Sequence, residues 1–230
     1  MAEGLLDWQA LMGQPLAAEE AAAFQAYYEA LVEGNRRMNL TAITAPEEAA
    51  LLHFADALSA EGYIPQGASV IDVGSGAGIP GIPLAIRRRD ASFLLLDSLQ
   101  KRVGFLNETV QLLGLTQVRA EHGRAEDAIK GRREAFDVGV ARAVAPLNVL
   151  CELVLPFVKV GGRMIAYKGP QAEEEAQRAK RALQILGGSL ESIEDVSLAG
   201  RAHKLILVKK VAKTPAAYPR RAGTPGKSPL

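Results

Sequence analysis

With 230 residues, 48% of them hydrophobic, the chain is long enough to bury a large core as one domain with extensions. Its single cysteine, Cys151, excludes a disulfide framework and a C-x-x-C metal site, and the three histidines are too scattered to suggest a metal centre. No basic-then-apolar leader opens the chain and no apolar run is long enough for a membrane span, so we expect a cytoplasmic protein that binds no metal and no membrane.

The first 66 residues are acidic and read as a helical extension. They contain ten acidic residues and two basic ones, Arg36 and Arg37. Alanines, aromatics and glutamates recur at helical spacing from 19 to 35, and a second helix is expected from Pro46 onward. That second helix carries His53 and Asp56 three residues apart, a spacing more typical of a surface hydrogen bond or ion pair than of catalysis.

The stretch Val70–Gly81, V-I-D-V-G-S-G-A-G-I-P-G, predicts a buried strand that ends in a glycine-rich turn. Such a turn lets a ligand approach the main chain. The run from Gly76 also satisfies the dinucleotide fingerprint, so the hypothesis of a nicotinamide-dependent reductase stays open. Pro80 and Pro83 remove donors from the following helix, which disfavours a diphosphate, whereas Asp72 suits a positively charged ligand. The pattern is similar to the first motif of the Rossmann-like methyltransferases, which bind S-adenosylmethionine.

The second half of a nucleoside site is expected at the end of the next strand. Asp97 closes the apolar run 92–96 and follows Gly74 by about twenty residues, the spacing of an acid that binds ribose hydroxyls. The same residue is also suited to cap the helix that follows.

The remaining pattern predicts a doubly wound sheet. Strands are expected at 117–121, 136–141 and 163–167, with helices at 124–130, 145–158 and 171–186 between or after them. Two alternating strands, 189–197 and 203–210, read as an edge hairpin turned at 199–201. Seven strands with an antiparallel final pair outline a Rossmann-like methyltransferase, whose ligands bind at the carboxyl ends of the strands. We therefore expect a helical extension at 1–66, a methyltransferase domain at 67–211 and an arm at 212–230.

The arm is basic and proline-rich. It has four prolines and no apolar periodicity, so neither helix nor strand is expected, and the last 22 residues contain six basic residues and no acidic one. Tyr218 beside Arg220 and Arg221 joins a stacking surface to two guanidinium groups, a combination suited to unpaired RNA. We expect the arm to pack on or near the active face.

Together these motifs resemble one family, the bacterial ribosomal RNA small subunit methyltransferase G, formerly glucose-inhibited division protein B. The matching stretches are Asn39-Leu40-Thr41, His53 with Asp56, Asp72–Gly78 with Pro80–Leu84, Asp97-Ser98 with Lys101-Arg102, Gly123–Glu126, Ala141–Leu147, Lys168-Gly169, and Tyr218–Arg221 with Gly223, Pro225, Lys227, Pro229 and Leu230. Many methyltransferases share the glycine loop, whereas the arm and Ala141–Leu147 are specific to this family. Ala57 and Ile79 depart from its usual serine and phenylalanine.

The resemblance implies methyl transfer from S-adenosylmethionine to N7 of a guanine in 16S rRNA, guanine 527 in the family's usual target. The partner would be the rRNA or a 30S particle, and we expect a monomer. The expected cofactor contacts are Asp72, Gly74, Gly76, Gly78, Ile79, Asp97, Ser98, Leu99, Ala125, Glu126 and Arg142. Arg142 is also expected to orient either the guanine or the cofactor carboxylate, with no general base. The expected RNA contacts are Asn39, His53, Lys168, Tyr218, Arg220 and Arg221.

Two further hypotheses stay open beside this one. A small-molecule methyltransferase would not need the basic arm, and a non-catalytic RNA-binding ribosome-assembly factor would tolerate loss of Asp97.

Overall fold

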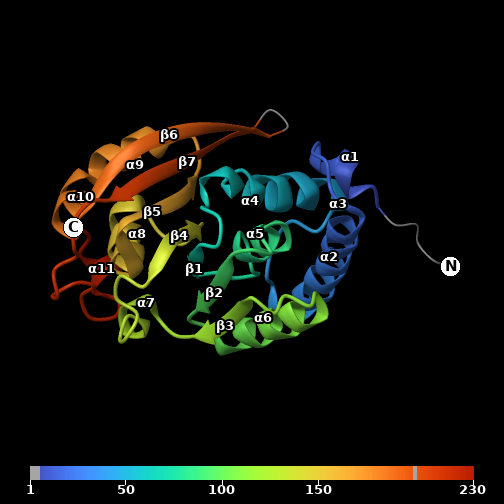
Figure 1. Cartoon of the computed structure of the whole chain (residues 1–230), viewed down its shortest axis with the longest axis horizontal. Helices are drawn as coiled ribbons and strands as arrows, with labels where there is room; N and C mark the ends of the chain where they lie inside the picture. Colours follow the sequence, from blue (N-terminus) through green and yellow to red (C-terminus); the bar gives the residue numbers. More distant parts are fainter. Residues whose placement is uncertain (1–5, 199–200) are drawn as a thin grey trace.

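A single seven-stranded sheet runs through the part of the chain that the computed structural model describes, residues 6–198 and 201–230 (Figure 1). The strands lie in the order β3-β2-β1-β4-β5-β7-β6. Their bounds are β1 Ser69–Val73, β2 Ser92–Asp97, β3 Val118–His122, β4 Phe136–Arg142, β5 Val158–Lys168, β6 Gly188–Leu198 and β7 Arg201–Lys210. The first five are parallel, and β7 is antiparallel to both β5 and β6. The predicted fold class is confirmed, while the turn of the expected hairpin, 199–200, lies outside the described residues.

Helices cover both faces of the sheet. They are α1 Trp8–Met12, α2 Ala18–Met38, α3 Pro46–Ala49, α4 Asp56–Leu58, α5 Gly81–Arg87, α6 Gln100–Leu112, α7 Ala125–Ala128, α8 Leu147–Val154, α9 Ala172–Arg178, α10 Lys180–Leu186 and α11 Thr224–Lys227. A π-helical segment, Ala50–Ala55, joins α3 to α4, and 3-10 turns span Glu61–Tyr63 and Leu155–Phe157.

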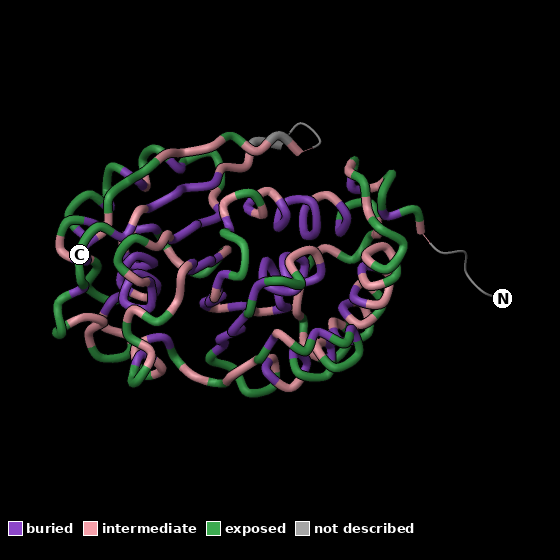
Figure 2. The backbone as a smooth tube through the Cα atoms, viewed as in Figure 1, coloured by how far each residue is buried: buried purple, intermediate pink, exposed green. Residues whose placement is uncertain are grey.

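The core is divided into two layers by the sheet, because successive side chains of a strand point to opposite faces. In β2, Phe93 and Leu95 pack among α2, α5 and α6, whereas Leu94 and Leu96 join the layer under α8 and α10. Figure 2 shows the central strands buried along almost their whole length. An apolar run without alternation is therefore what a strand buried on both faces requires.

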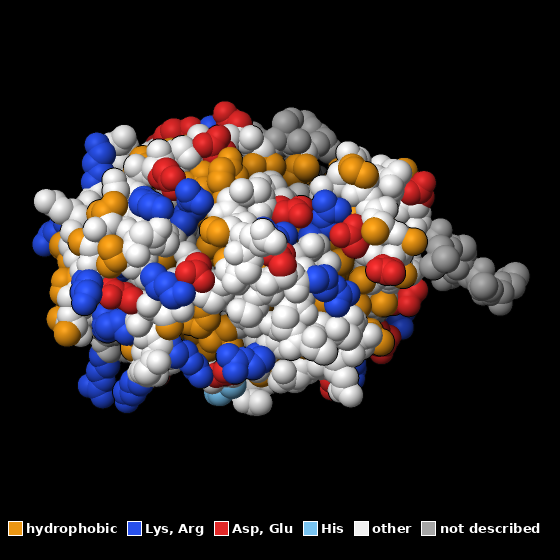
Figure 3. Space-filling model, in the orientation of Figure 1, with side chains coloured by type: hydrophobic (Ala, Val, Ile, Leu, Met, Phe, Trp, Pro, Cys, Tyr) orange, Lys and Arg blue, Asp and Glu red, His pale blue; other side chains and the backbone are white. Residues whose placement is uncertain are grey.

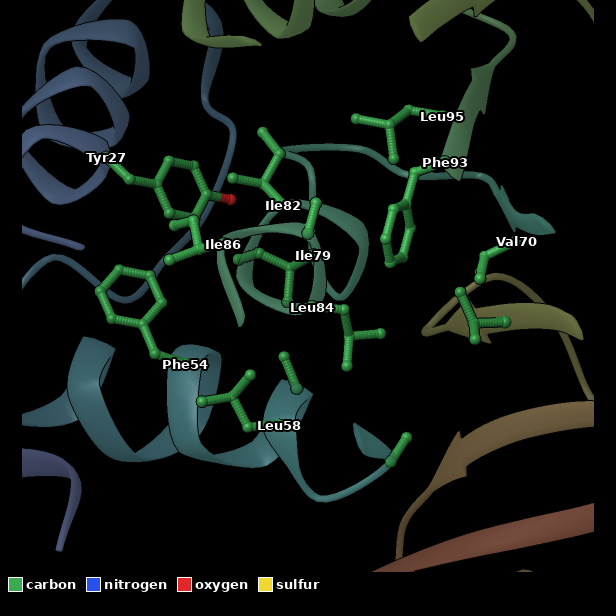
Figure 4. Close-up of a cluster of buried hydrophobic side chains, with 14 of the residues drawn as sticks. Tyr27, Phe54, Leu58, Val70, Ile79, Ile82, Leu84, Ile86, Phe93 and Leu95 are labelled. Atoms are coloured by element: carbon green, nitrogen blue, oxygen red, sulfur yellow. The ribbon is translucent and has the colours of Figure 1, made fainter. Parts of the chain in front are cut away.

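The N-terminal extension contributes apolar side chains to this core. Phe24, Tyr27 and Leu31 recur on one face of α2 and are buried with Phe54 of the π-helical segment against α5 (Figure 4). The Tyr27 hydroxyl donates a hydrogen bond of 2.9 Å to the carbonyl of Ala77 in the glycine loop. The N-terminal extension thus contacts and supports the glycine loop.

Several predicted boundaries were wrong. The helix expected at 171–186 is interrupted at Ala179, which separates α9 from α10. The strand β5 begins at Val158 because Gly161 and Gly162, read as a turn, lie inside it next to a register shift. The arm was expected to have no helix, yet Thr224–Lys227 forms α11. Helix α1 was not predicted at all.

The arm is bound to the rest of the protein by an ion pair with a buried carboxylate and by further hydrogen bonds. Glu152 of α8, 1% exposed at its side chain, accepts hydrogen bonds from the Arg220 guanidinium at 2.6, 2.9 and 3.1 Å and from the Arg220 amide. The Gly223 amide donates to Glu126 at 2.9 Å. The arm therefore reaches the beginning of α7, at the same edge of the sheet as the glycine loop.

Candidate functional site

Strand order places the glycine loop beside the end of β4. The chain runs from β1 outward to β3 and then returns to the other side of β1 with β4, so the carboxyl ends of β1 and β4 are neighbours at the switch point of the sheet. Asp72 pairs with Val140 across these strands, which brings Gly74 and Arg142 to the same edge.

The loop needs glycine for conformation and for space. Gly74, Gly76 and Gly78 have positive φ angles of 77°, 59° and 96°. A Cβ at Gly78 would lie 2.4 Å from the side chain of Ile82, whereas a Cβ at Gly76 would meet no atom closer than 3.9 Å. Gly78 thus permits the turn, while Gly76 leaves the main chain open on the side of the cavity it lines.

Asp97 fixes this loop from the end of β2. One carboxylate oxygen accepts a hydrogen bond from the Gly76 amide at 2.8 Å and the other accepts one from the Leu99 amide at 2.9 Å. Its side chain is 3% exposed, and Arg102 lies 3.7 Å away. Each oxygen keeps a second lone pair for a ligand hydroxyl. Asp97 therefore fits the predicted ribose contact and also orders the two backbone segments beside it.

Two cavities flank Gly74. One of about 240 Å³ is lined by the loop, His53, Arg102 and Arg142; the other, of about 150 Å³, is lined by Ser98, Ala125, Glu126, Val144 and Leu153. The first offers two guanidinium groups for a carboxylate, and the second offers apolar walls and a carboxylate for a neutral base with an amino group. The open backbone at Gly76 and the Asp97 carboxylate lie between them. These donors and acceptors fit S-adenosylmethionine, which has an amino-acid end, a ribose and an adenine.

Arg142 is held in place by a buried polar network. Its guanidinium donates to the Leu52 carbonyl at 2.7 Å, to the Asp56 carboxylate at 2.6 Å and to Nδ1 of His53 at 2.8 Å. Nδ1 must then be an acceptor, so Nε2 carries the ring proton and donates it to the Thr41 hydroxyl at 2.8 Å. Burial, with help from the Arg142 charge, lowers the pKa of His53 to about 4. The ring is therefore neutral near pH 7 and acts as an acceptor for Arg142.

The expected surface contact between His53 and Asp56 was wrong. Both side chains are buried, at 4% and 1% exposure, and they meet at Arg142. The second Asp56 oxygen lies 3.3 Å from Nδ1 of His203 in β7. Helical spacing placed the two residues on one face, but it did not indicate that this face would be covered by the end of β4.

Asp72 lies under the glycine loop and is fully buried. One oxygen accepts the Gly81 amide at 3.0 Å, and the other has no hydrogen-bond partner among the described residues. Burial raises the pKa of Asp72 to about 7. The structure thus places Asp72 as a support of the loop, and its expected contact with the charged end of a ligand stays a prediction.

Replacement of Asp72 by asparagine is expected to change how stability depends on pH. A carboxyl with a raised pKa favours the folded state while it is protonated, and this contribution is lost as the pH rises from about 4, the unfolded value, through about 7. Asparagine keeps the acceptor for Gly81 and does not ionise. The free energy of unfolding of D72N relative to the wild type, measured in urea, should therefore rise between pH 5 and pH 8. A constant difference would contradict the protonated, buried state.

The other predicted cofactor residues divide into two groups. Gly74, Gly76 and Ile79 line the cavity of about 240 Å³, and Ser98, Ala125 and Glu126 line the cavity of about 150 Å³. Leu99 contributes its amide to Asp97 and exposes its side chain.

The predicted RNA residues are dispersed. His53 lies inside the network described above, and Asn39 is exposed at the end of α2. Lys168 donates to Glu175 and to the Ala145 carbonyl, both at 2.7 Å. The Arg220 guanidinium is paired with Glu152, Tyr218 is half-buried, and Arg221 is exposed, with no hydrogen bond or ion pair from its guanidinium to another described residue. Their contacts with RNA stay predictions.

Sequence reasoning missed four residues of this region. Thr41, Arg102, Glu175 and His203 line its cavities or join the network, and they come from a loop, α6, α9 and β7. Thr41 and Arg102 lie in stretches that match the family pattern, which was the only available signal. His203 and Glu175 reach the site through strand order alone.

No helix of the described residues is long and apolar enough to cross a membrane. Nor do these residues contain a group of three or more His, Cys, Asp or Glu side chains arranged to hold a metal ion.

Fold and site together define a class. The sheet matches solved structures of methyltransferases at low identity: M. jannaschii TYW2 in complex with AdoMet (TM-score 0.57, 16% identity, 68% of this chain and 75% of that one) and an Aquifex aeolicus SAM-dependent methyltransferase (0.55, 18%, 73% and 94%). With the glycine loop and Asp97, the chain is a Rossmann-like S-adenosylmethionine-dependent methyltransferase.

The sequence comparisons then give the family. Residues 20–205 match the model of rRNA small subunit methyltransferase G. Ribosomal RNA small subunit methyltransferase G of Desulforamulus reducens is 47% identical over 94% of this chain and 92% of its own length, and that of Bacillus cereus is 47% identical over 95% and 94%. The chain belongs to this family. The resemblance drawn from the motifs is confirmed, and the reductase hypothesis is excluded.

Proposed function

We propose that the protein transfers a methyl group from S-adenosylmethionine to N7 of a guanine in 16S rRNA, guanine 527 in the numbering of the family's target. The observation that carries this proposal is the meeting of two cavities at Arg142. The glycine-loop cavity suits the donor, and a cavity of about 430 Å³ adjoins it beyond β4 and β5. Arg142 and Ala143 line both cavities, so a base that enters the cavity of about 430 Å³ reaches the donor at the wall that the two cavities share.

The chemistry asks for alignment more than for proton transfer. When bound, S-adenosylmethionine would supply a methyl group on a sulfonium. A nucleophile in line with the carbon–sulfur bond takes the methyl group, and S-adenosylhomocysteine is the leaving group. Guanine N7 has a lone pair and no proton, so no general base is needed. Holding two reacting atoms about 3–3.5 Å apart can supply several kcal/mol of the barrier. Asp56, His53 and the Leu52 carbonyl together fix Arg142 for such an orienting role.

The arm supplies cations for the RNA. Lys213, Arg221 and Lys227 are exposed, and their charged groups have no hydrogen bond or ion pair to another described residue. Arg220 anchors the arm through Glu152, and its guanidinium lies 6.0 Å from the Tyr218 ring centre. Figure 3 shows blue side chains gathered on the side of the molecule that carries α7, α11 and the C-terminus. We assign the three exposed cations of the arm to phosphate contacts. Lys168 lines the cavity of about 430 Å³, called the larger cavity below, and we assign it to the target nucleotide.

Replacing Lys213, Arg221 and Lys227 by alanine is expected to weaken the salt dependence of RNA binding. Three contacts with phosphates of a single strand contribute about two decades of affinity per tenfold change in salt. The slope of log Kd against log salt, measured by fluorescence anisotropy, should fall by about two. The matched control replaces Arg89, Lys159 and Lys209, at the edge of the sheet where the parallel strands begin, with the same change in charge, and its slope should stay that of the wild type. Equal slopes for both triple variants would contradict the assignment.

The cell compartment and oligomeric state are part of the proposal. A substrate in the ribosomal small subunit places the enzyme in the cytoplasm, and one chain carries both cavities and the arm, which supports a monomer. Size-exclusion chromatography with light scattering would test the latter.

The decisive experiment supplies labelled S-adenosylmethionine and 16S rRNA or 30S particles from a strain that lacks the modification, and then maps N7-methylguanine by chain cleavage. We expect one labelled guanine with the wild type. RNA binding without methylation would support an assembly factor. A small-molecule methyltransferase would keep its activity after deletion of residues 212–230, provided that the shortened chain still binds the donor.

A further inference from the structure

The larger cavity has apolar sides and a polar end. Ile43 and Leu52 from the N-terminal extension and Tyr167 from β5 form its sides. The Tyr167 hydroxyl donates to the Ala57 carbonyl at 2.6 Å, which fixes the ring. Arg142 lies where this cavity meets the glycine-loop cavity, and Asp56, Lys168 and Glu175 also line it. Pockets that receive an extruded base combine such apolar contacts with hydrogen bonds to the Watson–Crick edge.

Of the two carboxylates in this cavity, only Glu175 has an oxygen without a partner among the described residues. Asp56 uses one oxygen for Arg142 and the other for His203. Glu175 receives Lys168 at 2.7 Å and the Leu147 amide at 2.8 Å on the same oxygen, Oε2. Its second oxygen, Oε1, has no hydrogen bond to another described residue. Glu175 is therefore the carboxylate that can accept hydrogen bonds from a ligand.

Lys168 keeps one donor beside it. Its ammonium has three hydrogens and makes two hydrogen bonds, to Glu175 and to the Ala145 carbonyl. Its side chain is 9% exposed, so the charge is fixed in the cavity rather than free in solvent. The far wall of the cavity thus offers a carboxylate oxygen and an ammonium hydrogen next to each other.

These groups match guanine among the four bases. Its Watson–Crick edge has two adjacent donors, N1–H and the 2-amino group, next to the acceptor O6. Adenine offers an acceptor at N1 and cytosine at N3, and uracil has a single donor, N3–H, between two acceptors. N7 lies on the opposite edge from the 2-amino group. A guanine whose donors face Glu175 therefore directs N7 toward Arg142 and the glycine loop.

Resting on the function proposed above, we infer that Glu175 is the residue that selects guanine, by accepting hydrogen bonds from its N1–H and 2-amino groups at the far end of the larger cavity. Lys168 holds the carboxylate in position and lies beside O6. Arg142 lies at the other end of this cavity, beside the edge of the base that carries N7.

The test uses 16S rRNA assembled by ligation with guanosine or inosine at the target position. Inosine keeps N7, O6 and N1–H and lacks only the 2-amino group. A hydrogen bond to a charged group contributes about 10-fold to 100-fold, so the wild type should methylate the guanosine RNA with a kcat/KM higher than that of the inosine RNA by this factor.

Glu175→Gln is expected to lose most of this preference. The amide oxygen can still accept from Leu147, but its NH2 group opposes the donors of guanine. We expect kcat/KM on guanosine RNA to fall about 10-fold to 100-fold and the ratio of the two substrates to approach one. Binding of S-adenosylmethionine, measured by calorimetry, should not change. The matched control, Glu174→Gln, is exposed on the same helix and should keep the wild-type ratio.

The outcomes are distinguishable. A wild-type ratio near one overturns the assignment of Glu175 whether or not the variant folds, as does an unchanged ratio in a Glu175→Gln variant that binds the donor normally. Glu175→Asp, which keeps the charge, should retain a preference for guanosine and provides a second variant. If the wild type methylates neither RNA, the proposed function itself fails.

Discussion

Replacing Asp97 by alanine is expected to weaken binding of S-adenosylmethionine by about 100-fold or more. The variant loses the carboxylate that fixes the Gly76 and Leu99 amides and that faces the ribose, and each hydrogen bond to a charged group contributes about 1.5–3 kcal/mol. Isothermal titration calorimetry with the wild type, D97A and D97N gives the change directly. D97N keeps one acceptor and should fall between the other two.

The matched control for this experiment is Asp127→Ala. Asp127 lies on α7 close to Glu126, but it is exposed and does not line the cavities beside Gly74. Its replacement should leave the Kd within about twofold of the wild type. Donor binding that survives in D97A would contradict the position assigned to the cofactor, because no other carboxylate of the described residues bonds to the glycine-loop amide at Gly76.

Replacing Asp56 by alanine is expected to cost about 3 kcal/mol in the free energy of unfolding, because it removes a buried carboxylate and leaves the partly buried Arg142 guanidinium without its counter-charge. The double variant Asp56→Leu with Arg142→Met removes both charges and should recover part of that loss. It should not recover methylation, because Arg142 is then missing from the meeting point of the two cavities. Urea denaturation and the methylation assay separate the two effects.

A surface pair provides the comparison. Glu174 and Arg178 are 3.3 Å apart on α9, and their side chains are 64% and 75% exposed. Glu174→Ala should change the free energy of unfolding by no more than about 1 kcal/mol, because exposed pairs are solvated and screened. If Asp56→Ala costs no more than this control, the buried network does not hold Arg142 as we describe.

Local sequence patterns were sufficient to predict the buried central strands and the glycine turn. The apolar runs before Asp72 and Asp97 predicted β1 and β2, because a strand buried on both faces needs no alternation. Glycines at Gly74, Gly76 and Gly78 predicted a backbone turn, and all three have positive φ. Patterns failed where neighbours override local preference: Gly161 and Gly162 read as a turn, yet β4 and β7 pair with the strand that contains them.

By itself, the sequence determined the succession of the seven strands along the chain, the glycine loop, the acid at the end of β2 and the family. Only the tertiary structure decided what Arg142 and Arg220 do. Arg142 meets Asp56 across 86 positions of the chain, and Arg220 meets Glu152 across 68. A local pattern reports hydrophobicity and backbone preference over a few neighbours. The pairing of Arg142 with Asp56 depends on the return of β4 beside β1, and the pairing of Arg220 with Glu152 depends on the docking of the arm on α8. Neither contact can be predicted from a pattern of neighbouring residues.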